Sequence, residues 1–260
     1  MGNSKKHKRS KTIASVEKAV KVIEYMARSD HDMGVTEIAN GLNYGISATY
    51  HMLNTLRQCD VIEQDERTRK FKLGLKLWQI GLLAYRQNHI SSVLMPYLKK
   101  LKNLTGETAN LIIMNGDRVV YIAQEESDRL VRMFTEAGAT EQLHCTAAGK
   151  VLLSHKPKKT RELILDRIEL DRYTDKTIVD KEEFARELDQ VRERGYGFDN
   201  EERELGVSCI GAPVFNLNDE AIACITISGP TERFTEENKK KWLDMVLKVS
   251  KEATDHLTTI

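Results

Sequence analysis

Cysteine, histidine and aspartate could together form a hydrolase site, and this chain carries all three in its second half. Cys209 would act as the nucleophile, His144 as its base and Asp199 as the group that orients the base. None of the local signatures of cysteine nucleophiles surrounds Cys209. A zinc site from His144, Cys145 and Cys209 is also conceivable, but adjacent side chains on a strand diverge. We therefore expect no enzyme activity, no catalytic residue and no metal.

No Walker sequence and no Gly-x-Gly-x-x-Gly sequence is present, so no nucleotide or other cofactor is expected.

A second kind of chemistry is the binding of phosphates by a short basic segment. Residues 65–74 contain four basic side chains, although the formal net charge of the whole chain is only +1. Two β-prone runs, residues 61–65 and 70–74, flank the polar turn and predict a β-hairpin. Arg67, Arg69 and Lys70 would lie near its tip. A solvated charged turn is the alternative interpretation.

Three predicted helices precede this hairpin. Over residues 15–28 apolar residues recur at helical spacing, with Ser15 at the N-cap. Thr36 can cap a short second helix, and a third helix begins near Ser47. Two helices joined by a short turn form a helix-turn-helix, whose second helix enters the major groove of DNA. A hairpin directly after that helix is the wing of a winged helix-turn-helix. We therefore predict a DNA-binding domain over residues 12–74.

The open face of the third helix carries side chains that can bond to base edges, together with a small alanine that allows close approach. An ordinary solvated helix in a bundle is the alternative. The predicted DNA contacts are Thr36, Ser47, Ala48, Tyr50, His51, Asn54, Arg57, Arg67, Arg69 and Lys70.

Charge divides the chain into two parts. Residues 1–90 hold 15 Lys and Arg against 9 Asp and Glu, whereas the remainder holds 25 against 30. A basic first third and an acidic remainder suggest two domains with different partners. Residues 1–11 are basic without a following apolar core, which favours a disordered tail over a secretion signal. Scattered cysteines and the lack of a long apolar run predict a cytoplasmic protein without a membrane span.

A helix over residues 75–91 is expected to join the two parts without a flexible tether. From residue 92 to 260 strands and helices alternate, which predicts an α+β domain with helices outside antiparallel hairpins. The expected elements are hairpins over 108–126 and 206–229, a strand over 129–138, and helices over 145–154, 181–195 and 236–257.

The region 35–74 resembles the DNA-binding domain of the IclR family of bacterial transcription regulators. Residues 47–53 match the family pattern of small residues followed by paired apolar ones, and Phe71-Lys72-Leu73-Gly74 matches the end of its wing. His51 departs from the arginine that members commonly carry. The larger half is similar to the family's effector-binding domain, which is GAF-like. The linker helix, by the same resemblance, takes part in dimerisation beside the first helix.

The resemblance implies a repressor that binds a pseudo-palindromic double-stranded DNA operator as a homodimer or a dimer of dimers. It also implies a small organic acid, most simply a carboxylic acid, as effector. The methyl groups of Ala147 and Thr226 would narrow the effector pocket. A ligand-independent architectural DNA-binding dimer remains the alternative. Effector contacts carried over from the family are Ala147, Ala148, Asp199, Cys209, Thr226 and Ser228.

Overall fold

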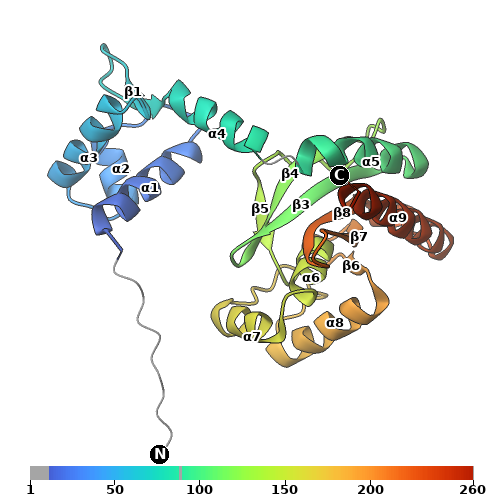
Figure 1. The fold of residues 1–260 in the computed structure, drawn as a ribbon. Helices are drawn as coiled ribbons and strands as arrows, with labels where there is room; N and C mark the ends of the chain where they lie inside the picture. Colours follow the sequence, from blue (N-terminus) through green and yellow to red (C-terminus); the bar gives the residue numbers. More distant parts are fainter. Residues whose placement is uncertain (1–11, 88–89, 260) are drawn as a thin grey trace, which may run out of the picture. The chain divides into compact units, whose positions relative to one another are not determined.

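A computed structural model gives the fold, and it describes residues 12–87 and 90–259. The predicted basic tail, residues 1–11, lies outside the described residues. The chain forms two compact units, residues 1–88 and 89–260 (Figure 1). Within the described ranges, no helix is both long and apolar enough to cross a membrane.

The first unit is a small helical domain with a β-hairpin, and it has its own core. The hairpin strands β1 and β2 pair antiparallel, and the turn between them projects from the helices (Figure 1). Val22, Ile38, Leu53 and Phe71 are buried together beneath the hairpin and helices. This arrangement is the predicted winged helix-turn-helix. Its elements are α1 (Ala14–Ala27), α2 (Val35–Gly41), α3 (Ile46–Gln58), β1 (Ile62–Gln64), β2 (Phe71–Leu73) and α4 (Leu75–Gln87).

Two helix starts differ from the sequence prediction. Ile13 occupies the N-cap position of α1 instead of Ser15, and Gly34 that of α2 instead of Thr36. Gly34 is favoured because its backbone N–H donates to the Glu37 carboxylate at 3.3 Å, which bonds the first turn back to the cap. Thr36 therefore lies inside the first turn of α2.

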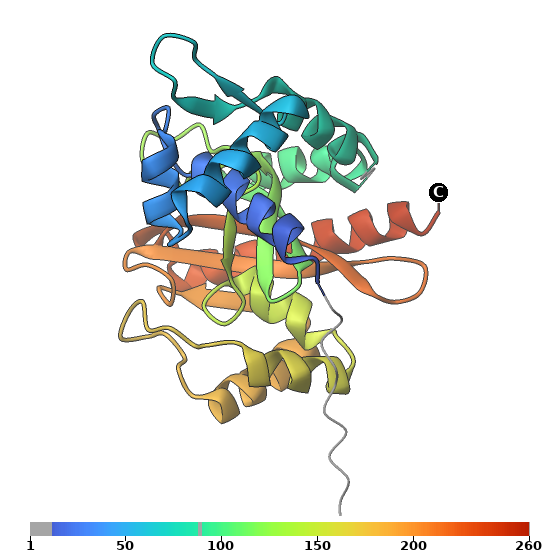
Figure 2. The ribbon, with the colours of Figure 1, turned by 90° about the vertical axis from the view of Figure 1, so that its left-hand side faces the viewer.

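The second unit is a six-stranded antiparallel sheet with helices on both faces, so its predicted α+β class is confirmed. The strand order is β5-β4-β3-β8-β7-β6. In both Figures 1 and 2, α7 and α8 lie farther from the sheet than α6 does. The strands are β3 (Thr108–Asn115), β4 (Arg118–Glu125), β5 (Thr140–Gln142), β6 (Gly197–Asn200), β7 (Val207–Phe215) and β8 (Ala221–Pro230). The helices are α5 (Ile90–Thr105), α6 (Ala147–Ser154), α7 (Lys158–Arg167), α8 (Lys181–Arg194), the 3-10 turn η1 (Thr231–Arg233) and α9 (Glu236–Leu257).

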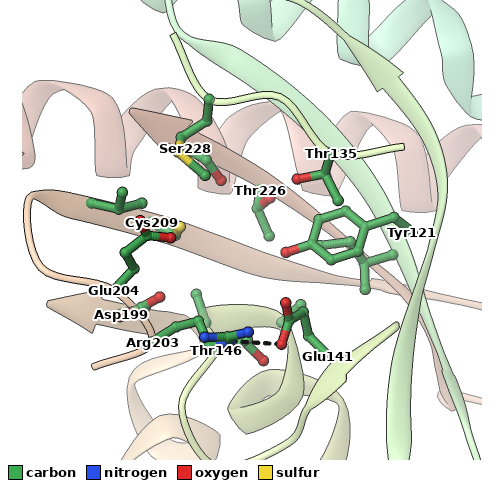
Figure 3. A pocket seen from close by; sticks show the side chains of 15 residues that line it. Tyr121, Thr135, Glu141, Thr146, Asp199, Arg203, Glu204, Cys209, Thr226 and Ser228 are labelled. Carbon is green, nitrogen blue, oxygen red and sulfur yellow. Dashed lines mark hydrogen bonds and ion pairs between the residues drawn. The ribbon is translucent and has the colours of Figure 1, made fainter. Parts of the chain in front are cut away.

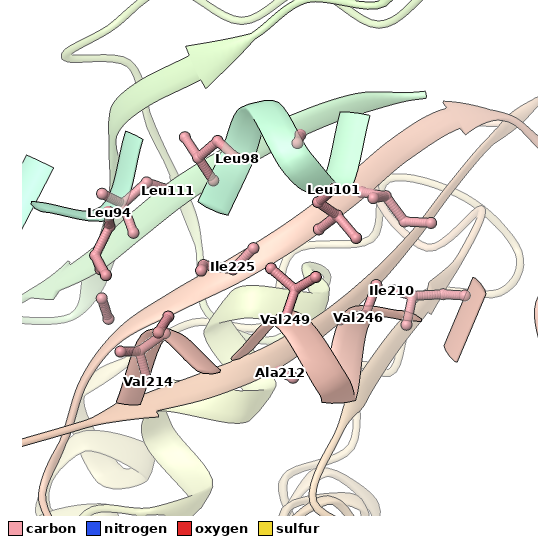
Figure 4. Close-up of a cluster of buried hydrophobic side chains, with 14 of the residues drawn as sticks. Leu94, Leu98, Leu101, Leu111, Ile210, Ala212, Val214, Ile225, Val246 and Val249 are labelled. Atoms are coloured by element: carbon pink, nitrogen blue, oxygen red, sulfur yellow. The ribbon is translucent and has the colours of Figure 1, made fainter. Parts of the chain in front are cut away.

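Side-chain alternation divides the unit into two cores. Leu98 of α5 and Val246 of α9 pack on one face of the sheet, against strand residues such as Leu111 and Ile225 (Figure 4). On the opposite face of the sheet lies α6, with α8 packed against α6, and Ile164 of α7 belongs to the same buried cluster. Since Ile225 points to the first face, its neighbour Thr226 points to the second. The polar positions of the central strands therefore face α6.

The join between the units begins as expected, but α5 begins before the expected domain boundary. The predicted helix over residues 75–91 is described as α4 up to Gln87. Ile90 and Ser91 belong instead to α5, because Ser91 is buried and Leu94 packs in the core of the second unit.

The strand predicted over residues 129–138 is wrong. This segment has no ladder partner, and Leu130 is 98% exposed. Side chains bond part of its backbone instead: Thr108 Oγ1 donates to the carbonyl of Met133 at 2.8 Å, and Arg233 Nη2 donates to that of Val131 at 3.0 Å. At its end the Gly138 backbone N–H donates to the Tyr121 carbonyl at 2.7 Å. Helix α7 and strand β6 were not predicted, because α7 buries only Ile164 and β6 has four residues.

Candidate functional site

The first candidate site is the open face of α3. Thr49 and Leu53 are buried on its inner side, and the Thr49 hydroxyl donates to the Gly45 carbonyl at 3.0 Å. Asn54 is half-buried at the edge of the outer face. On that outer face the predicted contacts Ser47, Ala48, Tyr50, His51 and Arg57 are exposed. The helix thus presents hydroxyl, imidazole and phenol groups together on one side, as major-groove reading requires.

The hairpin carries the second set of predicted contacts. We call Arg67, Arg69 and Lys70 the wing-tip cations; all three are exposed. Asp65 holds the turn, because its carboxylate accepts from the Thr68 backbone N–H at 2.6 Å and the Thr68 hydroxyl at 2.8 Å. These hydrogen bonds also lower the pKa of Asp65. The tip is therefore an ordered turn whose cations point away from a fixed backbone.

Hydrogen bonds connect the hairpin to α3 and to the segment before α2. Arg57 donates to Gln64 Oε1 at 2.8 Å, which joins the end of α3 to β1. The backbone N–H of Met33 donates to the Phe71 carbonyl at 2.9 Å, which joins the segment before α2 to β2. Thr36 is exposed on α2, three residues after this bridge. Helix, turn and wing are therefore joined by hydrogen bonds, and Arg57 has a structural partner besides any phosphate.

The second candidate site is a cavity of about 90 Å³ in the larger unit (Figure 3). Its walls come from the segment 133–135, strands β3, β4, β5, β6, β7 and β8, the start of α6, and nearby turns. All six effector contacts expected from the family resemblance line it: Ala147, Ala148, Asp199, Cys209, Thr226 and Ser228. Lining residues that sequence reasoning missed include Tyr121, Thr135, Glu141, Thr146 and Arg203.

Cross-strand register explains why these residues meet. Asp199 pairs with Cys209, and Cys209 pairs with Ser228, so three strands place them in one row. The adjacent row runs from Gly211 to Thr226 and on to Asn110. Residues in register on neighbouring strands point to the same face. Both rows therefore face α6.

Glycines in the sheet allow α6 to approach. A Cβ atom on Gly197 would lie 2.4 Å from the Ala147 carbonyl oxygen, and one on Gly211 would lie 3.6 Å from the Ala147 Cβ, in ordinary contact. The missing side chain of Gly197 lets the first turn of α6 sit directly over the rows. The Thr146 side chain caps that turn by accepting from the Gly149 N–H at 3.1 Å. The N–H groups of Ala147 and Ala148 precede the first intrahelical bond, so this end of the cavity is electropositive.

The carboxyl group of Asp199 is the main titrating group of the cavity. Burial raises the pKa of Asp199 to about 7, although its Oδ1 accepts from the Glu202 backbone N–H at 2.8 Å. At neutral pH a large fraction of this carboxyl group is protonated. Asp199 can therefore donate a hydrogen bond to a ligand as well as accept one.

A buried lysine joins two walls of the cavity. Lys150 of α6 is 1% exposed, and its Nζ lies 2.5 Å from Glu202 Oε1 and 2.9 Å from the Phe198 carbonyl oxygen. The Phe198 carbonyl belongs to β6, the edge strand that carries Asp199. Lys150 thus ties the helix wall to the strand wall behind the cavity.

One more charged pair closes the cavity. Arg203 donates to Glu141 Oε2 at 2.7 Å (Figure 3). The Arg203 guanidinium also lies over the Tyr173 ring, 4.3 Å from its centroid. The hydrogen bond to Glu141 raises the pKa of the Arg203 guanidinium. The positive charge of Arg203 is therefore already balanced by Glu141. Arg203 adds little net charge to the cavity, but its guanidinium can still orient a ligand by hydrogen bonding.

The geometry gives the hydrolase alternative no support. Burial raises the pKa of the Cys209 thiol, which is opposite to what an activated nucleophile needs. His144 does not line the cavity, and its Nε2 contacts the Asp171 carbonyl oxygen at 2.9 Å. Among the residues that the structure describes, no three His, Cys, Asp or Glu side chains form a metal-binding group.

Family models match both units of the chain. Residues 15–66 match the IclR helix-turn-helix domain, and residues 83–254 match the C-terminal domain of the bacterial transcriptional regulator IclR.

Two named regulators are similar over most of their length. BhcR of Paracoccus denitrificans, an HTH-type transcriptional regulator, is 35% identical over 240 residues, which cover 92% of this chain and 86% of that protein. AllR of Escherichia coli K12, an HTH-type transcriptional repressor, is 31% identical over 223 residues, covering 86% and 82%. Both relatives are named as regulators and not as enzymes.

Solved structures agree with the fold. The IclR protein of Thermotoga maritima superposes with a TM-score of 0.72 at 30% identity and covers 95% of this chain and 99% of that one. An IclR homologue of Microbacterium hydrocarbonoxydans, complexed with 4-hydroxybenzoate, has a TM-score of 0.79 at 18% identity, with 94% and 98% covered. The chain therefore belongs to the IclR family of bacterial DNA-binding transcriptional regulators.

Proposed function

We propose that this regulator is a repressor whose operator binding is controlled by a small carboxylic acid in the cavity between α6 and the sheet. The observation that carries the proposal is the convergence of six residues, from α6 and three strands, on one cavity. These residues were expected only from the family resemblance. Their positions in the sequence, which run from 147 to 228, do not by themselves predict that they meet.

The chemistry of the cavity suits a carboxylate. The first turn of α6 offers backbone N–H groups at the positive end of a helix, which bind anions. Thr226 and Ser228 add hydroxyl groups from one face of β8. Asp199 can donate a hydrogen bond while it is protonated, which its pKa of about 7 allows near neutrality. Together these groups offer an acid several donors, and Glu141, a carboxylate that also lines the cavity, is paired with Arg203.

The size of the cavity limits the acid. An apolar cavity of about 150 Å³ holds a benzene molecule. The cavity here measures about 90 Å³, so a compact aliphatic acid fits it better than an aromatic one. The methyl groups of Ala147 and Thr226 contribute to this restriction. The Microbacterium relative was crystallised with an aromatic acid, 4-hydroxybenzoate, which supports an acid as the general class.

The DNA-binding function follows from the first unit. The α3 face would read bases, and the wing-tip cations and Thr36 would bind the phosphates beside it. Two copies would read a pseudo-palindromic operator with recognition helices about 34 Å apart, as a homodimer or a dimer of dimers in the cytoplasm. Exposed apolar side chains on α1 and α4, including Val16 and Trp78, offer surface for that dimer.

The test combines a ligand screen with matched cavity variants. Short aliphatic acids should raise the melting temperature of the full chain, and one of them should change its affinity for operator DNA. Asp199→Ala and Cys209→Ala should lose this response while keeping operator affinity without ligand. Cys224→Ala, a buried cysteine that does not line the cavity, serves as the control.

Two outcomes would contradict the proposal. Normal responses of both cavity variants would place the effector elsewhere. No response to any acid, with operator binding intact, would favour the ligand-independent architectural dimer.

A further inference from the structure

We infer that Asn110 of β3 fixes the direction of hydrogen bonding in the cavity, so that Thr226 and Ser228 act as donors to the ligand. Asn110 does not line the cavity and is 1% exposed. Its Nδ2 lies 3.1 Å from Thr226 Oγ1 and 3.1 Å from Ser228 Oγ. One buried amide therefore serves both hydroxyl groups. The inference rests on the proposed function only for the statement that a ligand occupies this cavity.

The direction of these hydrogen bonds follows from a backbone group. The Thr135 backbone N–H can only donate, and it lies 3.5 Å from Gln124 Oε1. With Oε1 as its acceptor, the Gln124 side chain presents Nε2 to Asn110 Oδ1 at 2.8 Å. Asn110 must then present Nδ2 to the two hydroxyl groups. The chain of bonds runs one way, from the 129–138 segment to the cavity.

Strand register holds this relay in place. Gln124, Asn110 and Thr226 are direct cross-strand neighbours on β4, β3 and β8. Ser228 lies two residues after Thr226 and so on the same face of β8. The relay therefore consists of adjacent side chains on the rigid centre of the sheet. No mobile segment has to close to form the bonds between these four side chains.

A hydroxyl group that accepts a hydrogen bond still has one proton to donate. Within residues 12–87 and 90–259, the Thr226 hydroxyl donates to no protein acceptor. The Ser228 hydroxyl lies beside the thiol of Cys209, and burial raises the pKa of that thiol, so it remains a weak neutral acceptor. The Thr226 proton is therefore available to a ligand, and the Ser228 proton becomes available when a carboxylate replaces this weak acceptor. Asn110 thus makes the sheet wall of the cavity a donor surface, which prefers an anion to a neutral molecule of the same shape.

The first test compares an anion with its neutral isostere. Lactate and lactamide are the two probes, and calorimetry on the full chain gives their affinities. Asn110→Asp reverses the relay, because a carboxylate accepts from the hydroxyl groups, and the ratio of lactate affinity to lactamide affinity should fall roughly 30-fold, since two hydrogen bonds of about 1 kcal/mol each change. Asn110→Leu removes the relay without adding charge and should give an intermediate ratio. Asn115→Asp, the same substitution at an exposed position of β3, should leave the ratio unchanged.

The ratio of lactate affinity to lactamide affinity distinguishes a residue that orients the hydroxyl groups from one that only packs in the core. A residue that only supports the fold would weaken both probes equally. An unchanged ratio in Asn110→Asp would overturn the inference. A change in Asn110→Asp with none in Asn110→Leu would also overturn it, because charge repulsion alone would then explain the result.

The second test requires no ligand and no variant. Neutron diffraction from deuterated crystals of the full chain should show both Nδ2 deuterons of Asn110 directed at the hydroxyl oxygens, and the Thr226 deuteron directed into the cavity. Hydroxyl deuterons directed at Asn110 would overturn the inference. The expected deuteron positions, combined with no binding of either probe, would instead count against the proposed acid and leave the inference standing.

Discussion

Replacement of Asp199 by Asn should make the larger unit more stable at high pH. The pKa of Asp199 is raised from 3.8 to about 7, chiefly by burial. The folded state therefore holds a proton that the unfolded state releases between about pH 4 and pH 7. Stability contributed by this proton is present below pH 4 and is lost as the pH rises through 7.

The magnitude follows from the size of the pKa change. One pKa unit corresponds to about 1.4 kcal/mol, so the complete loss amounts to roughly 4 kcal/mol at pH 8. Asparagine cannot ionise, and its carbonyl oxygen can still accept the hydrogen bond from the Glu202 N–H, which Asp199 Oδ1 now accepts at 2.8 Å. The difference in unfolding free energy between Asp199→Asn and the wild type should therefore grow by up to about this amount from pH 4 to pH 8.

The assay is urea unfolding of the full chain, followed by the fluorescence of Trp242. This side chain is 4% exposed and packs against Phe234 in the larger unit. The second tryptophan, Trp78, belongs to α4 and would be replaced by Phe in all variants. Asp244→Asn, at an exposed position of α9, is the control and should show no such pH dependence. A difference that stays constant from pH 4 to pH 8 would refute the assignment of a protonated Asp199.

Three further predictions concern other parts of the molecule. Replacing the wing-tip cations together by Ala should weaken binding to all DNA sequences and reduce the salt slope by about 0.9 for each phosphate that is no longer neutralised; an unaltered slope would remove the wing from the DNA interface. Tyr50→Ala or His51→Ala should change which operator bases are tolerated in a selection from random sequences, and an identical preference would exclude them as readers. Lys150→Met should lower the unfolding free energy by about 3–5 kcal/mol, because it leaves Glu202 buried without its partner. Adding Glu202→Gln to Lys150→Met should restore most of that stability, and a double variant no more stable than the single one would contradict the ion-pair explanation.

Local patterns predict the elements that have strong periodicity. Helix α9 is expected over residues 236–257, where the structure places it, because its apolar residues keep helical spacing and Thr235 caps it. The segment 129–138 resembles a strand in sequence because it is rich in apolar residues. Its backbone is bonded by Thr108 and Arg233, which lie far away in the sequence. A local pattern cannot reveal such partners.

The same limit applies to the cavity. Alternation on β8 predicts that Thr226 and Ser228 face one way, which the sheet register agrees with. Asn110 and Gln124 give no signal, since their relation to Thr226 depends on the pairing of three strands. Arg203 lies in an irregular segment, and nothing in its neighbourhood in the sequence indicates its place beside Glu141.

The close seating of α6 over Gly197 and Gly211 has a consequence for selectivity among related acids. At Gly197 the strand lies directly against the Ala147 carbonyl of α6, and at Gly211 the nearest α6 atom is the Ala147 Cβ, so the cavity cannot be enlarged at that end without moving a helix. The size of the cavity can then be adjusted only through single methyl groups, such as those of Ala147 and Thr226. One methylene in an apolar pocket discriminates by about 1–3 kcal/mol, or roughly 10- to 200-fold. A regulator built this way would distinguish neighbouring members of a homologous series only within that range, and would respond to the ratio of their concentrations in the cell.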